Sequence, residues 1–356
     1  MSMSSLWQTI TTRFREDAPK LVYAPIPKSR TDAGYDDRPL VPGESYFKIW
    51  LTEMFLAHSR DWFAEWQPAV HCSVKLTFNN QPAVNFSSVA RAAEDAKVNG
   101  VLLNYKLSEL MPFNGGDVEI AAGLLALKGK SDLRFAVNLL ASFSSLVAPP
   151  LGQAIAIADK VAGGVETLIQ DTHGEIRLPF HQTFTSQAGG GSNGLRPGYI
   201  AVLNADAQTI KPDDLSVRTD RLHYRDQPLT GVDYLLFRIE GRAERDDWRF
   251  ASIAEPLQQA KTAIVGRDET RAVTLLNQAI LAAYNSPDLA EADRMRVISA
   301  IKADFEKARG IGYGAAGAQQ TDLNEIIRNG AISREESLLL GKPQVERLFV
   351  KSEGIA

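Results

Sequence analysis

Two stretches of this chain of 356 residues carry glycine patterns that active sites use. Gly190–Gly194 reads G-x-S-x-G, the pattern that exposes a nucleophilic serine, here Ser192, between a buried strand and a helix. Pro197 and its neighbours predict another strand where the helix should be, so we interpret this stretch as a loop.

Gly312–Gly317 reads G-x-G-x-x-G, which binds dinucleotide phosphates only after a strand. A helix is predicted before it, and we therefore interpret it as a linker between helices.

A third stretch, Gly123–Ser131, resembles a Walker A loop but has one residue too many between its glycines. Its interior is Leu-Leu-Ala-Leu, which belongs in a buried strand. A phosphate-binding loop instead presents its backbone N–H groups to the ligand. This stretch therefore predicts a strand that ends in a Lys-Gly-Lys turn.

Nucleophilic and metal-binding side chains are few and scattered. The five histidines have no compact ligand spacing, and there is a single cysteine. Cys72 shares its strand face with Val70 and Val74, which predicts a buried and unreactive thiol, while His71 points to the other face. His181 lies opposite the apolar face of its own strand and is a candidate for lining a cleft. The sequence thus assigns no catalytic residue, no cofactor and no metal site.

Three tryptophans, Trp50, Trp62 and Trp66, lie close together in the sequence. Aromatic side chains bury large areas, so core packing is the first interpretation. The alternative is a partner-binding surface, where tryptophan is enriched. These three are the candidate partner-binding residues of the chain.

Residues 135–158 contain no charged side chain, which is the most unusual feature of the sequence. Pro149 and Pro150 divide the apolar stretch, and a proline pair ends one helix and can begin the next. We therefore predict a two-helix insertion over 133–170 that packs on the sheet. Membrane insertion or a partner interface is the alternative, although each half is too short to cross a bilayer.

Strands are predicted where apolar and polar side chains alternate. The clearest runs from Val70 to Phe78, and others contain Phe47–Leu51 and Ile176–Phe184. Shorter strands are predicted at 101–105, 118–127, 199–203 and 232–239. No helices interleave them regularly, which favours antiparallel pairing over a parallel sheet. The sequence predicts an α+β protein whose N-terminal domain, residues 46–248, is an antiparallel β-sandwich or barrel-like fold.

Helices are predicted at both ends of the chain. Residues 1–45 are interpreted as a short helix followed by a Pro-rich linker, and 249–345 as a small all-α C-terminal domain with a tail at 346–356. Asp268 begins a helix in the latter, and Ser286 caps the next. The charged stretch 242–249 is predicted to be a solvated junction between the domains.

Composition narrows the classes of function. Hydrophobic residues make up 44% of the chain and the net charge is -4, which predicts a soluble globular protein and disfavours a nucleic-acid partner. One cysteine allows no internal disulfide, and the first residues are polar without an apolar run of signal-peptide length. We therefore expect a cytoplasmic protein.

The function predicted from these patterns is a non-catalytic protein-interaction or assembly subunit, with a protein partner or self-association. The first alternative is a membrane-active effector that uses the 133–170 hairpin. The second is a hydrolase-like enzyme whose residues are dispersed over several strands.

Overall fold

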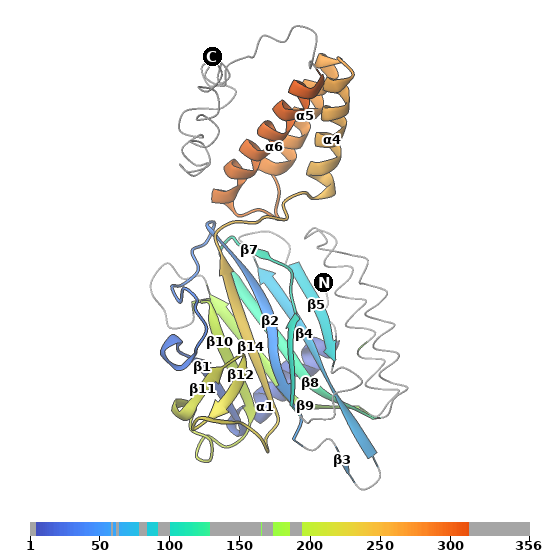
Figure 1. Ribbon diagram of the computed structural model, residues 1–356. Coiled ribbons are helices and arrows are strands. Elements are labelled where there is room, and N and C mark those ends of the chain that lie inside the picture. Colours follow the sequence, from blue (N-terminus) through green and yellow to red (C-terminus); the bar gives the residue numbers. More distant parts are fainter. Residues whose placement is uncertain are drawn as a thin grey trace. The chain divides into compact units, whose positions relative to one another are not determined.

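A computed structural model describes residues 5–57, 60–61, 64–77, 84–91, 100–128, 165, 174–185 and 194–312. The protein is a mixed α/β chain with mostly antiparallel sheets (Figure 1). Its contacts divide it into two compact units, Met1–Arg242 and Ala243–Ala356.

A six-stranded sheet is the centre of the first unit. Its strand order is β1-β10-β14-β2-β6, with β7 also paired to β2, and all the pairs are antiparallel. The strands are β1 (Leu21–Ile26), β2 (Ser45–Phe55), β6 (Gly100–Lys106), β7 (Met111–Phe113), β10 (Gly198–Asn204) and β14 (Tyr234–Arg242). Strand β1 occupies part of the segment that the sequence predicted to be a linker, because residues 21–26 pair along β10.

A five-stranded sheet has the order β3-β4-β8-β9, with β5 also paired to β4. Its strands are β3 (Arg60–Asp61), β4 (Ala64–Thr77), β5 (Val84–Arg91), β8 (Asp117–Lys128) and β9 (Glu175–Thr185). The predicted strands in 70–78, 118–127 and 176–184 are confirmed, and Gly123 lies inside β8 rather than in a phosphate loop. Both larger sheets are open in the strands described.

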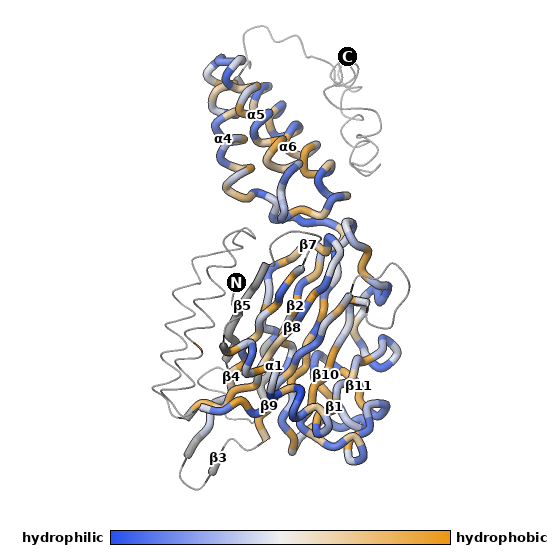
Figure 2. Tube along the Cα trace, turned by 180° about the vertical axis from the view of Figure 1, so that it is seen from behind, coloured by the Kyte–Doolittle hydropathy of each residue, from blue (hydrophilic) through white to orange (hydrophobic). Residues whose placement is uncertain are grey.

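One apolar cluster takes side chains from both larger sheets. It includes Ile49 and Phe237 of the six-stranded sheet and Val70, Cys72 and Phe180 of the five-stranded sheet. Alternation supplies these side chains, since every second residue of each strand faces the cluster. Figure 2 shows hydrophobic stretches along the strands and hydrophilic ones in the loops around β11.

A β-bulge in β2 changes the alternation at one point. The register of β2 against both neighbouring strands shifts between Leu51 and Glu53. A bulge adds one residue to a strand, so the following side chains change faces. Glu53 therefore points away from the face that Leu51 occupies, and it lies fully buried under a small third sheet.

The small sheet has the order β11-β12-β13, with β11 (Leu215–Arg218), β12 (Arg221–Tyr224) and β13 (Gln227–Pro228). Its apolar side chains share a second cluster with residues of β1, β10 and β14. Glu53 fastens it to β2, because its carboxylate accepts from the Leu222 backbone N–H at 2.9 Å and from Arg221 Nε at 3.2 Å.

Helix α1 (Ser5–Asp17) confirms the helix predicted at the N-terminus. It packs on the five-stranded sheet through Leu6, Trp7 and Ile10. Val165 belongs to the same cluster and is helical and fully buried. The rest of the predicted 133–170 insertion lies outside the described residues.

The second unit contains α4 (Ala251–Val265), α5 (Glu269–Tyr284) and α6 (Glu291–Gly312) in its described part. The helix predicted to begin at Asp268 is confirmed, and the structure shows in addition that the Asp268 side chain caps α5 by accepting from the Arg271 N–H. Helix α6 begins five residues after Ser286 and continues through Gly310, so Ser286 does not cap it. The predicted helical signals after residue 312 and the 346–356 tail lie outside the described residues.

The charged side chains of the predicted solvated junction 242–249 are exposed, with the exception of Arg245. This residue is only 3% exposed, and its backbone N–H donates to Asp293 Oδ2 at 3.1 Å. Its guanidinium lies over the Phe250 ring at 4.7 Å, and its carbonyl accepts from Arg296 Nη2 at 2.6 Å. Arg245 thus fixes the start of the second unit to α6.

Among the described helices, none combines the length and apolar composition needed to span a bilayer.

Candidate functional site

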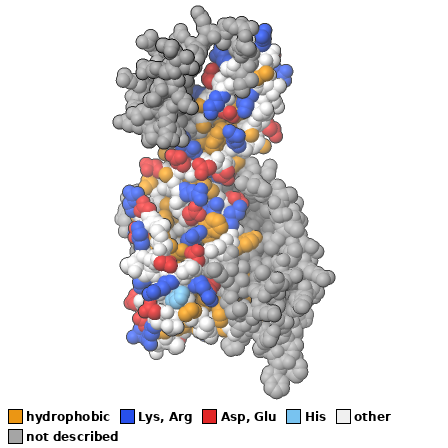
Figure 3. Space-filling view, in the orientation of Figure 1, with side chains coloured by type: hydrophobic (Ala, Val, Ile, Leu, Met, Phe, Trp, Pro, Cys, Tyr) orange, Lys and Arg blue, Asp and Glu red, His pale blue; other side chains and the backbone are white. Residues whose placement is uncertain are grey.

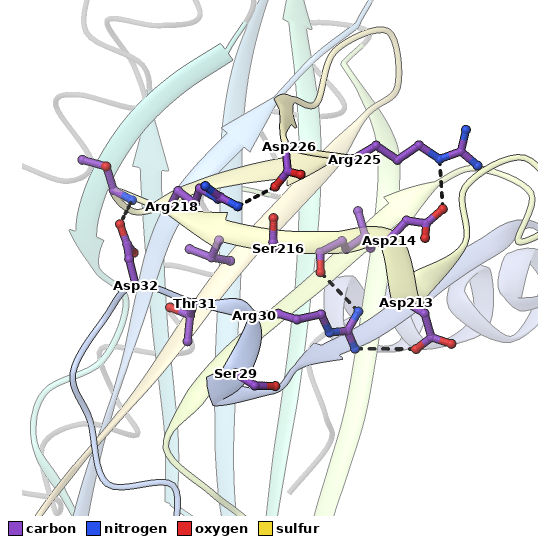
Figure 4. Close-up of a pocket in the computed structure, with 13 residues that line it drawn as sticks. Ser29, Arg30, Thr31, Asp32, Asp213, Asp214, Ser216, Arg218, Arg225 and Asp226 are labelled. Carbon is purple, nitrogen blue, oxygen red and sulfur yellow. Dashed lines mark hydrogen bonds and ion pairs between the residues drawn. The ribbon is translucent and has the colours of Figure 1, made fainter.

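A polar hollow of about 620 Å³ opens beside β11 (Figure 4). One wall is Ser29–Asp32, and the other is formed by residues 213–219 with Arg225 and Asp226. The first wall closes the free edge of β11: the Leu215 carbonyl accepts from Arg30 Nη1 at 3.2 Å, and the Val217 carbonyl accepts from the Asp32 N–H at 3.3 Å. Because an uncovered edge invites strand pairing with other chains, these contacts have a structural role.

The arginines of the hollow all have acidic partners. Arg218 pairs with Asp226 at 2.5 Å, Arg225 with Asp214 at 3.0 Å, and Arg30 lies 3.6 Å from Asp213. Each of these pairs keeps at least one side chain well exposed to solvent. The hollow therefore offers a ligand no unpaired arginine and no dry environment.

Trp50 lies on the outer face of the six-stranded sheet, away from the shared core. The register places Tyr199, Arg238, Trp50 and Lys106 directly opposite one another across β10, β14, β2 and β6. Directly opposed residues of antiparallel strands share a face, so these four side chains form one row. Tyr199 is buried at one end, Arg238 and Trp50 are half-buried, and Lys106 is exposed.

The surroundings of Trp50 are strongly polar. Its Nε1 donates to Glu240 Oε2 at 2.7 Å. Lys48 Nζ lies 5.2 Å from the indole centroid, and the Arg238 guanidinium carbon lies 5.3 Å from it. We call Lys48, Trp50, Lys106, Arg238 and Glu240 the Trp50 face. Figure 3 shows Lys and Arg side chains, with acidic ones between them, over the region of β2 and β14.

The tip of the β11–β12 hairpin borders this face. Asp220, with φ of 60°, accepts from the Tyr199 hydroxyl at 2.6 Å and from Asn104 Nδ2 at 3.2 Å. Burial, followed by the Asp220 hydrogen bond, raises the pKa of Tyr199. The tip is therefore held at the buried end of the row, and the opposite end stays open to solvent.

The other two candidate tryptophans differ from Trp50. Trp66 is half-buried and packs against the shared core, with the Arg177 guanidinium 5.8 Å from its ring centroid. Trp62 lies outside the described residues. Of the three candidate tryptophans, Trp50 is therefore the one that the described part of the structure places on a polar face. Alternation with Ile49 and Leu51 is the sequence signal that places it there.

His181 meets an acidic residue of the neighbouring strand. Its Nε2 lies 3.5 Å from Glu119, whose other oxygen pairs with Lys75 at 2.7 Å. The His181 ring nitrogen and then Lys75 lower the pKa of Glu119 to about 2, which holds the carboxylate ionised. Trp7 and Phe14 of α1 contact the imidazole edge-on. His181 thus takes part in the contact between α1 and the five-stranded sheet.

The remaining candidates for chemistry are Cys72, Ser192 and the glycine-rich segment Gly312–Gly317. Cys72 is 1% exposed, which confirms that the thiol is buried, and burial raises its pKa to about 12. Its lack of reactivity stays a prediction. Ser192 and the glycines after Gly312 lie outside the described residues. In the part of the chain that the structure describes, no group of His, Cys, Asp and Glu side chains could hold a metal ion.

No family model, curated protein or solved structure matches the chain. The geometry of its own residues is therefore the basis for a functional proposal.

Proposed function

We propose that this protein is a cytoplasmic protein-interaction or assembly subunit that binds its partner through the Trp50 face. The observation that carries the proposal is the half-buried indole of Trp50, held between Lys48 and Arg238 on the outer side of a central strand. Tryptophan and arginine are the residues on which binding energy most often concentrates in protein interfaces.

A rigid support strengthens this interpretation. Trp50 lies in β2, which pairs on both sides with other strands of the sheet. Its Nε1 bond to Glu240 fixes the ring, so little side-chain entropy remains to be lost on binding. We further infer that the two larger sheets form a sandwich, because both contribute alternate side chains to one cluster. The Trp50 face is then the outer surface of one layer.

The buried position of Val165 bears on the alternative of a membrane-active effector. That side chain is fully buried in the cluster that also contains Ile10 and Leu125, so Val165 itself is not free to enter a bilayer in this structure. The proposal therefore keeps the interaction role as the principal function.

A photocrosslinking residue in place of Lys106 tests the proposal in the cells that make the protein. Lys106 is exposed at the open end of the row, so a partner bound over Trp50 should be captured there. We expect an adduct of defined mass, and we expect Trp50→Ala in the same background to abolish it while the chain still unfolds cooperatively.

The matched control carries the crosslinking residue at Lys211, which is also exposed but lies outside the row. A crosslink from Lys106 no stronger than that from Lys211 would rule out the Trp50 face as the binding surface. So would an adduct that survives Trp50→Ala unchanged.

A further inference from the structure

The Trp50 face and its immediate neighbours carry more positive than negative charge. Lys48, Lys106, Arg238 and Arg242 supply four cations around the indole. Glu109, Glu240 and, at the buried end of the row, Asp220 supply three carboxylates. The whole chain has the opposite balance, with a net charge of -4. The local excess of one positive charge is therefore a property of this surface and not of the protein as a whole.

The salt bridges leave two of these cations without a carboxylate. Lys106 pairs with Glu109 at 2.5 Å and Arg242 with Glu240 at 2.6 Å. Within the described residues, no salt bridge joins Lys48 or Arg238 to an acidic side chain. These are the two cations that flank the Trp50 ring.

Both groups are partly removed from water. Burial lowers the pKa of Lys48, the neighbouring cations Lys106 and Arg242 lower it further, and Glu240 acts in the opposite direction. The Nε of Arg238 is buried and has no hydrogen-bond acceptor in the described part of the chain. Arg238 hydrogen-bonds to the Tyr199 hydroxyl, but neither Arg238 nor Lys48 has a carboxylate at salt-bridge distance in the described residues. A carboxylate that reaches the accessible part of either side chain would form a charge-assisted hydrogen bond.

We propose that the partner binds the Trp50 face with an acidic segment, whose carboxylates pair with Lys48 and Arg238 while a neighbouring apolar side chain covers the exposed part of the Trp50 indole. This inference rests on the proposed interaction function and names the chemistry of the partner. Complementary charge fixes the register of the segment, and the aromatic contact adds apolar burial.

The arrangement favours a protein segment over a nucleic acid or a membrane. Glu240 bonds to the indole itself, and Glu109 holds Lys106, so a polyanion laid across the face would meet both carboxylates. Two cations at one aromatic ring instead match a short cluster of acidic side chains. A flat anionic surface gains most from many exposed cations without interspersed acids.

The test removes the two charges and keeps Trp50. In the chain with the crosslinking residue at position 106, we combine Lys48→Gln with Arg238→Gln and measure adduct yield after lysis of the same cells, at increasing salt concentration. We expect about a tenfold loss of yield at low salt, because charge pairs of this kind each contribute substantially to affinity. The captured partner peptide should contain several Asp or Glu residues. The charge-preserving pair Lys48→Arg and Arg238→Lys should retain most of the yield.

The matched control is Arg218→Gln with Arg225→Gln, which removes two arginines from the polar hollow beside β11 and should leave the yield unchanged. An adduct that is abolished by Trp50→Ala but insensitive to Lys48→Gln with Arg238→Gln would overturn the acidic-segment inference and leave the interaction function standing. Absence of any Trp50-dependent adduct would instead remove the interaction function itself.

A second measurement uses defined probes with the purified full chain. A labelled peptide of repeated Glu-Glu-Leu should bind, and its Lys-Lys-Leu counterpart should not. Vesicles containing phosphatidylserine and a short DNA duplex are the competing ligands. Binding of either through Lys48 and Arg238, with no binding of the acidic peptide, would refute the choice of a protein segment.

Discussion

Replacement of Glu53 by alanine should destabilise the first unit and release its small sheet. The Glu53 side chain is fully buried, and its carboxylate accepts from the Leu222 N–H at 2.9 Å and from Arg221 Nε at 3.2 Å. The same carboxylate contributes, after burial, to a raised pKa of the Tyr234 hydroxyl beside it. Alanine leaves the Leu222 N–H and the Tyr234 hydroxyl without this acceptor inside an apolar cluster.

The expected loss in the free energy of unfolding depends on which groups of this network are buried. A buried donor that loses its acceptor costs about 1–3 kcal/mol, and a broken buried ion pair costs about 3–5 kcal/mol. The Arg221 side chain is 44% exposed and can turn to solvent, so its share is small. We expect a loss of about 2–4 kcal/mol in the free energy of unfolding for Glu53→Ala. Glu53→Gln, which keeps one acceptor, should lose less.

Urea unfolding and amide hydrogen exchange measure the two parts of this prediction. Exchange of the hairpin Leu215–Tyr224 should accelerate, because Glu53 fastens it to β2. Asp226→Ala is the matched control, since it breaks an Arg–Asp pair at the same small sheet whose side chains are 58% and 72% exposed. That change should cost about 0–1 kcal/mol. Equal effects of the two substitutions would refute the argument that burial gives Glu53 its importance.

Three further predictions concern the five-stranded sheet. Cys72 should resist a thiol reagent in mildly alkaline native buffer and react fully in denaturant, since burial raises its pKa to about 12; fast native labelling would contradict this. Glu119 has its pKa lowered to about 2, so its pairing stabilises the fold above the ordinary carboxyl pKa and is lost as the pH falls toward 2; Glu119→Gln should flatten that part of the stability–pH curve. Ile10→Ala should cost about 2–5 kcal/mol because a cavity is left under α1, whereas Gln8→Ala on its exposed side should cost about 0.5 kcal/mol or less in the same unfolding assay.

The sequence by itself determined the features that depend on neighbours along the chain. Alternation placed Ile49 and Cys72 on buried faces, and the Asp268 carboxylate marked the start of α5. These signals are local, because the side-chain period of a strand and the free N–H groups of a helix end depend on a few consecutive residues. The same alternation placed Trp50 on the other face of the strand from Ile49.

Only the tertiary structure decided which strands lie side by side. The row of Arg238, Trp50 and Lys106 joins three strands that are far apart in the sequence, and no local pattern encodes their order. The bulge after Leu51 likewise moved Glu53 to the other face, although strict alternation would have kept the two together. Arg245 is buried for a similar reason, since its acceptors and packing partners include groups on α6. Strand order, bulges and buried charges are fixed by long-range pairing and packing, whose energies depend on residues that meet only in the folded chain.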